Sequence, residues 1–252
     1  MNTQQKNMDV ISNNLANVNT TGFKKSRAEF EDLLYATLER PDGPIGAERS
    51  TPAGIQLGHG ARTSATLKNF QTGSMIETEQ NFDLAVEGDG FFIIDSADGM
   101  EQHYTRDGSF KIDGEGNLVT SDGLNVASFD GVIEEEHSDI SISPEGVVTA
   151  TLEDGEVEEI GQFMLARFIN PAGLESLGGN LYQETAGSGF PQEGFPGEEG
   201  IGSVRQGFLE GSNVNIAEEM VNMIIAQRAY ETNSKSVQST DEMMSITNNM
   251  KR

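Results

Sequence analysis

The carboxyl-terminal end of this chain carries an unbroken apolar strip with a seven-residue spacing, formed by Ile216, Met223, Tyr230, Val237 and Met244. Such a repeat suits a helix and excludes a strand, because strand side chains alternate with a period of two. Asn215 is a suitable N-cap, and Glu218 stands at the capping-box position. We therefore predict a helix from about residue 216 to about residue 248, roughly 50 Å long at about 1.5 Å per residue.

The amino-terminal end shows a shorter version of this pattern. Met1, Met8 and Leu15 are seven residues apart, and Ile11 and Val18 lie on the complementary seam. This helix should end within Ser12–Lys25, where Asn and Thr side chains compete for backbone groups and Gly22 permits a turn. So narrow a seam is typical of a helix that packs against another helix.

Two interpretations of these end helices remain open. The companion seam of the second helix, at Met220, Gln227, Ser234 and Asp241, becomes steadily more polar. The helices could form an intramolecular hairpin, or they could form subunit contacts that only other copies complete. The residues that we expect at an assembly interface are Met8, Ile11, Leu15, Val18, Ile216, Met220, Met223, Tyr230, Val237 and Met244.

The middle of the chain has the features of β-structure. Phe82, Leu84 and Val86 alternate with other residues, and Phe91–Ile94 is a short apolar run. Asp-Gly pairs, which favour tight turns, begin at positions 42, 89, 98, 107, 113, 122, 130 and 154. From this spacing we expect a series of hairpins over residues 82–170. The segments Pro41–Gly60 and Gly187–Gly200 are expected to be irregular.

The net charge of −25 is confined to this middle region. Residues 71–212 hold 29 acidic and four basic residues, whereas the two ends are nearly neutral. Nucleic acid is an unsuitable partner for such a surface, because phosphate binding needs clustered Lys and Arg. The neutral ends can pack together without repulsion.

No pattern in the chain points to catalysis, a cofactor or a metal. The acidic groups Glu134–Glu136 and Glu156, Glu158, Glu159 could mimic a glycosidase pair, but a solvated acidic face explains them better. Asp113, Glu115 and Asn117 alternate like the start of a calcium loop, but Leu118 and Leu124 stand where Gly and Glu are required. His59, His103 and His137 lack metal-ligand spacing. Gly88-Asp89-Gly90 is expected to be a turn before a strand rather than a dinucleotide loop.

Several further classes are excluded by composition. The chain has no cysteine, so disulfide frameworks and zinc ribbons are excluded. It has no apolar run approaching 18 residues, so no membrane span is expected. No basic region followed by an apolar stretch opens the sequence, so a conventional secretory signal is not expected.

Five motifs follow one another along the chain: SNNLANVNTTGFKK (Ser12–Lys25), GDGFFIID (Gly88–Asp95), YTRDGSF (Tyr104–Phe110), GLESLGGNLY (Gly173–Tyr182) and SNVNIAEEMVNMIIAQRAYETNSK (Ser212–Lys235). In this order they resemble the signatures of the rod and hook axial protein family of the bacterial flagellum. The resemblance covers essentially the whole chain and is greatest to the distal rod members. That choice depends on the Pro41–Gly60 loop, on NFQTGSM (Asn69–Met75) and on the single modest middle domain. Proximal rod members are close rivals.

The resemblance implies a structural subunit of the distal rod, the shaft that transmits torque from motor to hook. The implied location is the basal body in the cell envelope, reached through the flagellar type III export apparatus. The implied partners are identical subunits, the hook protein and proximal rod proteins, with ring proteins or peptidoglycan as further candidates. Members of the family usually begin a few helical turns earlier, so Met1 falls where an internal residue is expected. A different class, a secreted carbohydrate-active β-domain, is the alternative.

The expected fold is a mainly β middle domain flanked by N- and C-terminal α-helices that pack together like a coiled coil on assembly. Three parts are expected. Residues 1–30 and 213–252 would form a terminal helical domain, residues 31–81 and 186–212 a connecting β and loop region, and residues 82–185 a β-rich outer domain.

Overall fold

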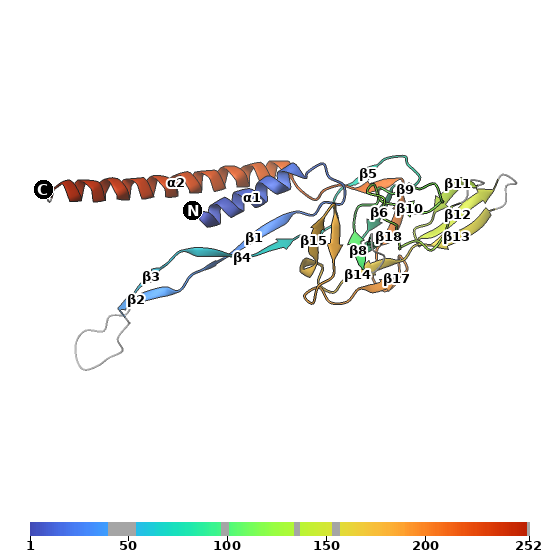
Figure 1. The fold of residues 1–252 in the computed structure, drawn as a ribbon, viewed down its shortest axis with the longest axis horizontal. Helices are drawn as coiled ribbons and strands as arrows, with labels where there is room; N and C mark the ends of the chain where they lie inside the picture. The colour runs from blue at the N-terminus through green and yellow to red at the C-terminus, as the bar shows by residue number, and fades with distance from the viewer. Residues whose placement is uncertain (40–53, 97–100, 134–136, 153–156, 251–252) are drawn as a thin grey trace, which may run out of the picture. The chain divides into compact units, whose positions relative to one another are not determined.

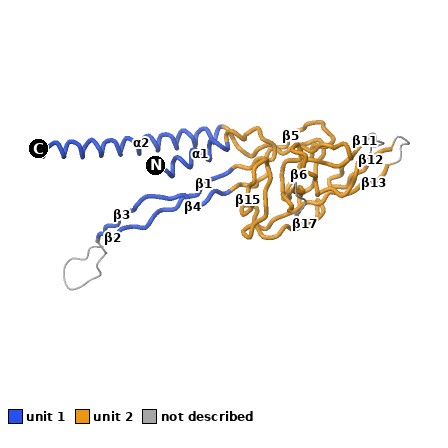
Figure 2. The backbone as a smooth tube through the Cα atoms, viewed as in Figure 1, with its two compact units in different colours: residues 1–14, 26–67, 217–252 blue, residues 15–25, 68–216 orange. Residues whose placement is uncertain are grey.

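The computed structural model describes residues 1–39, 54–96, 101–133, 137–152 and 157–250. The chain divides into two units, which Figure 2 shows in different colours. Unit 1 comprises residues 1–14, 26–67 and 217–252, and unit 2 comprises residues 15–25 and 68–216. The expectation of a mostly β protein with one helix near each end is confirmed (Figure 1).

Unit 1 contains the two helices and two strand pairs. Helix α1 (Asn2–Ala16) ends in the predicted segment, and α2 (Ile216–Asn249) begins directly after the predicted N-cap Asn215. Strand β1 (Ser26–Asp32) pairs with β4 (Ala61–Lys68), and β2 (Tyr35–Glu39) pairs with β3 (Ile55–Gly58). Both pairs have only two strands, and exposed apolar side chains lie on β2 and β3 at Tyr35, Leu38, Ile55 and Leu57.

A buried asparagine holds the helices and β1 together in unit 1. The Asn14 Nδ2 donates to Oε2 of Glu219 in α2 at 3.1 Å and to the Ser26 carbonyl at 2.8 Å. The Ser26 N–H donates back to Asn14 Oδ1 at 2.9 Å. At the other end of α1, the Thr3 hydroxyl donates to the Ala61 carbonyl in β4 at 3.0 Å. Helix α1 is therefore tied to α2, β1 and β4.

Unit 2 is built around a six-stranded sheet with the order β15-β16-β8-β7-β14-β17. Its central strand β7 carries the predicted apolar run, and all four residues Phe91–Ile94 are buried. Phe92 and Ile94 belong to one hydrophobic cluster, whereas Phe91 and Ile93 belong to another. This division follows from the strand period of two, which sends alternate side chains to opposite faces of the sheet.

The remaining elements of unit 2 form a three-stranded sheet β11-β12-β13 and the pairs β5–β19, β6–β18 and β9–β10. The bounds of the elements of unit 2 are β5 (Met75–Glu77), β6 (Leu84–Glu87), β7 (Phe91–Asp95), β8 (Gln102–Thr105), β9 (Lys111–Ile112), β10 (Leu118–Val119), β11 (His137–Ile142), β12 (Val147–Leu152), β13 (Val157–Gln162), β14 (Leu165–Arg167), a 3-10 turn (Pro171–Gly173), β15 (Glu175–Gly178), β16 (Leu181–Gln183), β17 (Gln192–Gly194), β18 (Ser203–Gln206) and β19 (Phe208–Glu210).

The expected series of hairpins is only partly correct. Hairpins β7–β8, β9–β10 and β12–β13 enclose the Asp-Gly pairs at 98, 113 and 154, of which the first and last lie outside the described residues. Strand β6 instead pairs with the distant β18. The pair at 107 serves another purpose there: the Leu84 N–H donates to the Gly108 carbonyl, and a Cβ on Gly108 would lie 1.8 Å from the Leu84 oxygen. Glycine at this position permits a close backbone approach.

Candidate functional site

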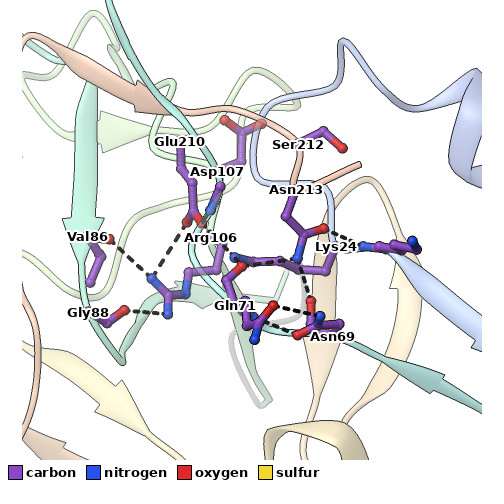
Figure 3. A network of polar contacts seen from close by, with 12 residues as sticks. Lys24, Asn69, Gln71, Val86, Gly88, Arg106, Asp107, Glu210, Ser212 and Asn213 are labelled. Carbon is purple, nitrogen blue, oxygen red and sulfur yellow. Dashed lines mark hydrogen bonds and ion pairs between the residues drawn. The ribbon is translucent and has the colours of Figure 1, made fainter. Parts of the chain in front are cut away.

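Three charged side chains from distant parts of the sequence meet inside unit 2 (Figure 3). The Lys24 Nζ lies 2.6 Å from Oε1 of Glu210, and the Arg106 Nη1 lies 3.6 Å from Oε2 of Glu210. No more than 2% of any of the three side chains is exposed. We call Lys24, Arg106 and Glu210 the buried triad. Lys24 precedes β1, Arg106 follows β8 and Glu210 ends β19, the last strand, so the triad joins three segments that are far apart in the sequence.

Arg106 is held by strand β6 and by the turn that follows it. Its guanidinium donates to the Val86 carbonyl at 3.3 Å and to the Gly88 carbonyl at 2.7 Å. The guanidinium carbon also lies 5.2 Å from the centre of the Phe91 ring, within cation–π distance. The Gly88-Asp89-Gly90 motif is therefore a turn before a strand, as predicted, and its backbone binds an arginine of the same chain.

Polar contacts around the triad tie three chain segments together (Figure 3). The Lys24 Nζ donates to the Gln71 carbonyl at 2.9 Å, and the Gly73 N–H donates to Oε1 of Glu210 at 2.8 Å. The Lys25 N–H donates to Asn213 Oδ1 at 2.7 Å. The Asn213 Nδ2 in turn donates to the carbonyls of Asn69 at 2.8 Å and Gln71 at 3.1 Å. Residues 24–25, 69–73 and 210–213 are thus joined side by side.

A second set of contacts joins the turn after α1 to the core motifs. The Thr21 hydroxyl donates to Asp107 Oδ1 at 2.9 Å, and the Asn180 Nδ2 donates to the Thr21 carbonyl at 3.0 Å and to Asp107 Oδ2 at 3.3 Å. Gly22, the residue after Thr21, has a φ of +67°. A Cβ on Gly22 would lie 2.7 Å from the Asp107 backbone nitrogen, so this position requires glycine.

Burial dominates the electrostatics of this region. It lowers the pKa of Lys24 below the ordinary 10.5; the Glu210 carboxylate opposes this shift and the nearby Arg106 adds to it. Burial also raises the pKa of Tyr104 to about 12, with smaller contributions from Glu184 and Glu193, and raises that of Tyr182. The folded chain therefore keeps both phenols neutral and holds a lysine whose charged form is costly.

All five sequence motifs contribute residues to the buried triad and the polar contacts around it, which together we call the junction of unit 2. The sequence did not predict the triad itself. Lys24, Gly88, Arg106 and Asn180 come from four of the five motifs, and Asn213 comes from the fifth. One signal pointed to Arg106, because it is one of only four basic residues among residues 71–212. Nothing local indicated which acid pairs with it.

The ten residues predicted for an assembly interface differ in exposure. Ile11 is buried, and Met8, Leu15, Val18, Met223 and Tyr230 are half-buried. Four others, Ile216, Met220, Val237 and Met244, are exposed, by 49%, 52%, 51% and 66%. The strip of the second helix is thus split: Met223 and Tyr230 share a partly covered face with the buried Ala226, whereas both ends of the strip are open to solvent. Their role in assembly stays a prediction.

Sequence reasoning missed part of the exposed apolar surface of α2. Val221, Ile224 and Ile225 are 55%, 48% and 61% exposed, and with Met220 they cover the first turns of the helix. The run MVNMII at residues 220–225 was the available signal, because consecutive apolar residues cannot all face one partner.

The other chemical candidates have structural explanations. The Asp113 carboxylate accepts the N–H groups of Glu115 and Asn117, each at 2.9 Å, and these backbone hydrogen bonds hold its pKa below the ordinary 3.8. Within the described residues, no group of three acidic or histidine side chains is placed to hold a metal. No helix in the described part of the chain is both long and apolar enough to cross a membrane.

Comparison with known proteins places the whole chain among flagellar sequences. Three family models match: the flagella basal body rod protein at residues 1–24, the D1 domain of the flagellar hook protein FlgE/F/G at residues 85–150, and the C-terminal region of the flagellar basal body rod FlgEFG protein at residues 205–250. The flagellar basal-body rod protein FlgG of Borreliella burgdorferi is 53% identical over 100% of this chain and 96% of its own length. FlgG of Buchnera aphidicola is 47% identical (96% and 92%), and FlgG of Agrobacterium fabrum is 44% identical (98% and 94%).

Proposed function

Because the chain belongs to the family of flagellar basal-body rod and hook proteins, we propose that it is a structural subunit of the distal rod of the flagellum. The observation that carries this proposal is the similarity to FlgG proteins over the full length of the chain. The location that follows is the flagellar basal body, and export by the type III apparatus is consistent with the family.

The proposed mechanism is mechanical. Many copies would pack through their terminal helices, and torque would pass along the rod through these repeated contacts. The exposed apolar residues of α2 support this mechanism, because a helix with such a surface is incomplete without a partner. The exposed residues Val221, Ile224 and Ile225 would extend the predicted interface, which already includes Met220.

Several narrower statements belong to the same proposal. The partners would be identical subunits, the hook protein and proximal rod proteins, with ring proteins or peptidoglycan as further candidates. Coiled-coil packing of the helices would arise on assembly. The three-part division of the chain into residues 1–30 with 213–252, 31–81 with 186–212, and 82–185 stays a prediction. We propose that the chain is not an enzyme, which agrees with its membership of a family of structural proteins. No observation favours the alternative of a carbohydrate-active domain.

The test is assembly of the purified full-length chain at high concentration, followed by electron microscopy and sedimentation. Val237→Ala removes an exposed residue of the strip and should reduce the sedimenting fraction, while the thermal unfolding of unit 2 stays unchanged. Val157→Ala is a matched control, because Val157 is 69% exposed on β13 of unit 2. Equal assembly of the two variants would contradict the proposed role of α2.

A further inference from the structure

The buried triad is unbalanced in charge. Lys24 and Arg106 bring two positive charges into the interior, and Glu210 brings one negative charge. Asp89 and Tyr182 also act on Arg106, but Asp89 is exposed to solvent, and burial raises the pKa of Tyr182 so that its phenol stays neutral. Glu210 is therefore the carboxylate that lies between both cations.

Glu210 acts on Arg106 mainly through its negative charge rather than through a hydrogen bond. Among the described residues, Oε2 of Glu210 accepts no hydrogen bond, although it lies 3.6 Å from the Arg106 guanidinium. Oε1 accepts from Lys24 at 2.6 Å and from the Gly73 N–H at 2.8 Å. Without this carboxylate, two like charges would be buried close together, which is strongly unfavourable.

The three charges are supplied from widely separated places in the sequence. Lys24 and Arg106 are present as soon as the first half of the chain is available, whereas Glu210 lies at the end of the last strand of unit 2. Glu210 and the residue after it, Gly211, also form backbone hydrogen bonds with the earlier segments. The Gly22 N–H donates to the Glu210 carbonyl at 2.8 Å, and the Gly211 N–H donates to the Ser74 carbonyl at 2.7 Å.

We propose that Glu210 makes the folding of unit 2 conditional on its own carboxyl-terminal segment. Until β19 is in place, closing the core around Lys24 and Arg106 would bury two cations without a counter-charge. The chain before β19 therefore stays open, and the arrival of Glu210 permits closure. This device concerns folding and does not depend on the proposed function. For a subunit exported as proposed above, it would delay folding until nearly the whole chain has arrived.

Refolding kinetics of the full-length chain test this inference. Tyr104 and Tyr182 are buried in unit 2, the other two tyrosines (Tyr35 and Tyr230) lie in unit 1, and the chain has no tryptophan. In a Tyr35→Phe, Tyr230→Phe background the tyrosine signal therefore reports closure of unit 2. Glu210→Gln should slow refolding about tenfold or more, with a smaller change in the unfolding rate, because the missing charge is needed before the rate-limiting step is passed. The control Glu87→Gln removes the partner of Arg205 in an exposed ion pair and should change neither rate.

A second variant tests whether charge balance is the cause. In a Lys24→Met background only one cation remains in the triad, so Glu210→Gln should slow refolding less than it does in the wild type. If Glu210→Gln alone does not fold, the double variant should still fold. Faster unfolding with an unchanged refolding rate would overturn the inference, because Glu210 would then act only after closure. An effect of equal size in both backgrounds, or failure of the double variant to fold, would also overturn it.

Discussion

At the scale of single residues, the junction inside unit 2 depends on residues that their surroundings do not allow to be replaced. Gly22 is the clearest example, because its φ of +67° disfavours a side chain and the nearby Asp107 backbone leaves no room for one. The Thr21 and Asn180 contacts to Asp107 on either side require the same path of the chain. A small change here therefore acts on contacts between distant segments.

Gly22→Ala should destabilise unit 2 by about 2–4 kcal/mol, because it adds backbone strain and a steric clash with Asp107. Gly123→Ala is the matched control: Gly123 has φ +81°, and its added Cβ would meet no atom within 4 Å. That variant should lose only about 1 kcal/mol from strain. Urea unfolding followed by the tyrosine signal in a Tyr35→Phe, Tyr230→Phe background measures both losses, and equal losses would refute the steric explanation.

At the scale of elements, α2 has two different surfaces. Its first half carries the buried Glu219 and Ala226 on the side that includes the Asn14 contact, whereas Met220, Val221, Ile224 and Ile225 are exposed. Its last turns have no buried residue, and Met243, Met244 and Ile246 are about 60% exposed. The order of unit 1 in a single subunit thus depends on the contact between α1 and the first half of α2.

Asn14→Ala should loosen α1 from α2 and β1, because it removes the hydrogen bonds to Glu219 and Ser26. We expect a loss of about 1–3 kcal/mol, which is typical when a buried charged or polar group loses its partner. Amide hydrogen exchange at a concentration too low for assembly should speed up in α1 and the first half of α2, but not in unit 2. Ser12→Ala, on an exposed position of α1, should leave exchange unchanged. Unchanged protection in Asn14→Ala would show that apolar packing alone holds α1.

At the scale of the whole molecule, charge separates the parts of the chain. The acidic excess of residues 71–212 lies entirely in unit 2, whereas the segments that supply the helices are nearly neutral. Glu158 and Glu159 on β13 are exposed in the single chain, while Glu134, Glu135, Glu136 and Glu156 lie outside the described residues. That all six face outward and stay hydrated in the assembled rod remains a prediction. A surface of this charge repels its own copies at distances below about 8–10 Å at ordinary salt.

Replacing these six glutamates with glutamine should leave assembly intact, because the proposed interface lies on the helices. Motility at low salt should fall, since a repulsive outer surface would help the shaft to turn within its surroundings. Swimming speed of cells that carry the variant, compared at low and high salt, measures the effect. The competing explanation is that the charge reflects only a saline or alkaline habitat. If motility is unchanged in the variant, only this habitat explanation remains.

The sequence by itself determined the features that depend on local order. A seven-residue apolar period determined both helices, because side chains at that spacing share one face of a helix. The apolar run Phe91–Ile94 indicated the buried central strand β7, and the five motifs indicated the family. All of these signals lie within short stretches of chain, where backbone geometry alone relates one residue to the next.

Only the tertiary structure decided which distant residues meet. It paired β6 with β18 rather than with its neighbour in the chain, and it placed Lys24, Arg106 and Glu210 in one buried cluster. It also divided the apolar residues of α2 between a face turned toward its own unit and a face open to a partner. The physical reason is that burial and charge pairing depend on contacts across the whole chain, and a local pattern shows that a residue is apolar or charged without showing what will cover it.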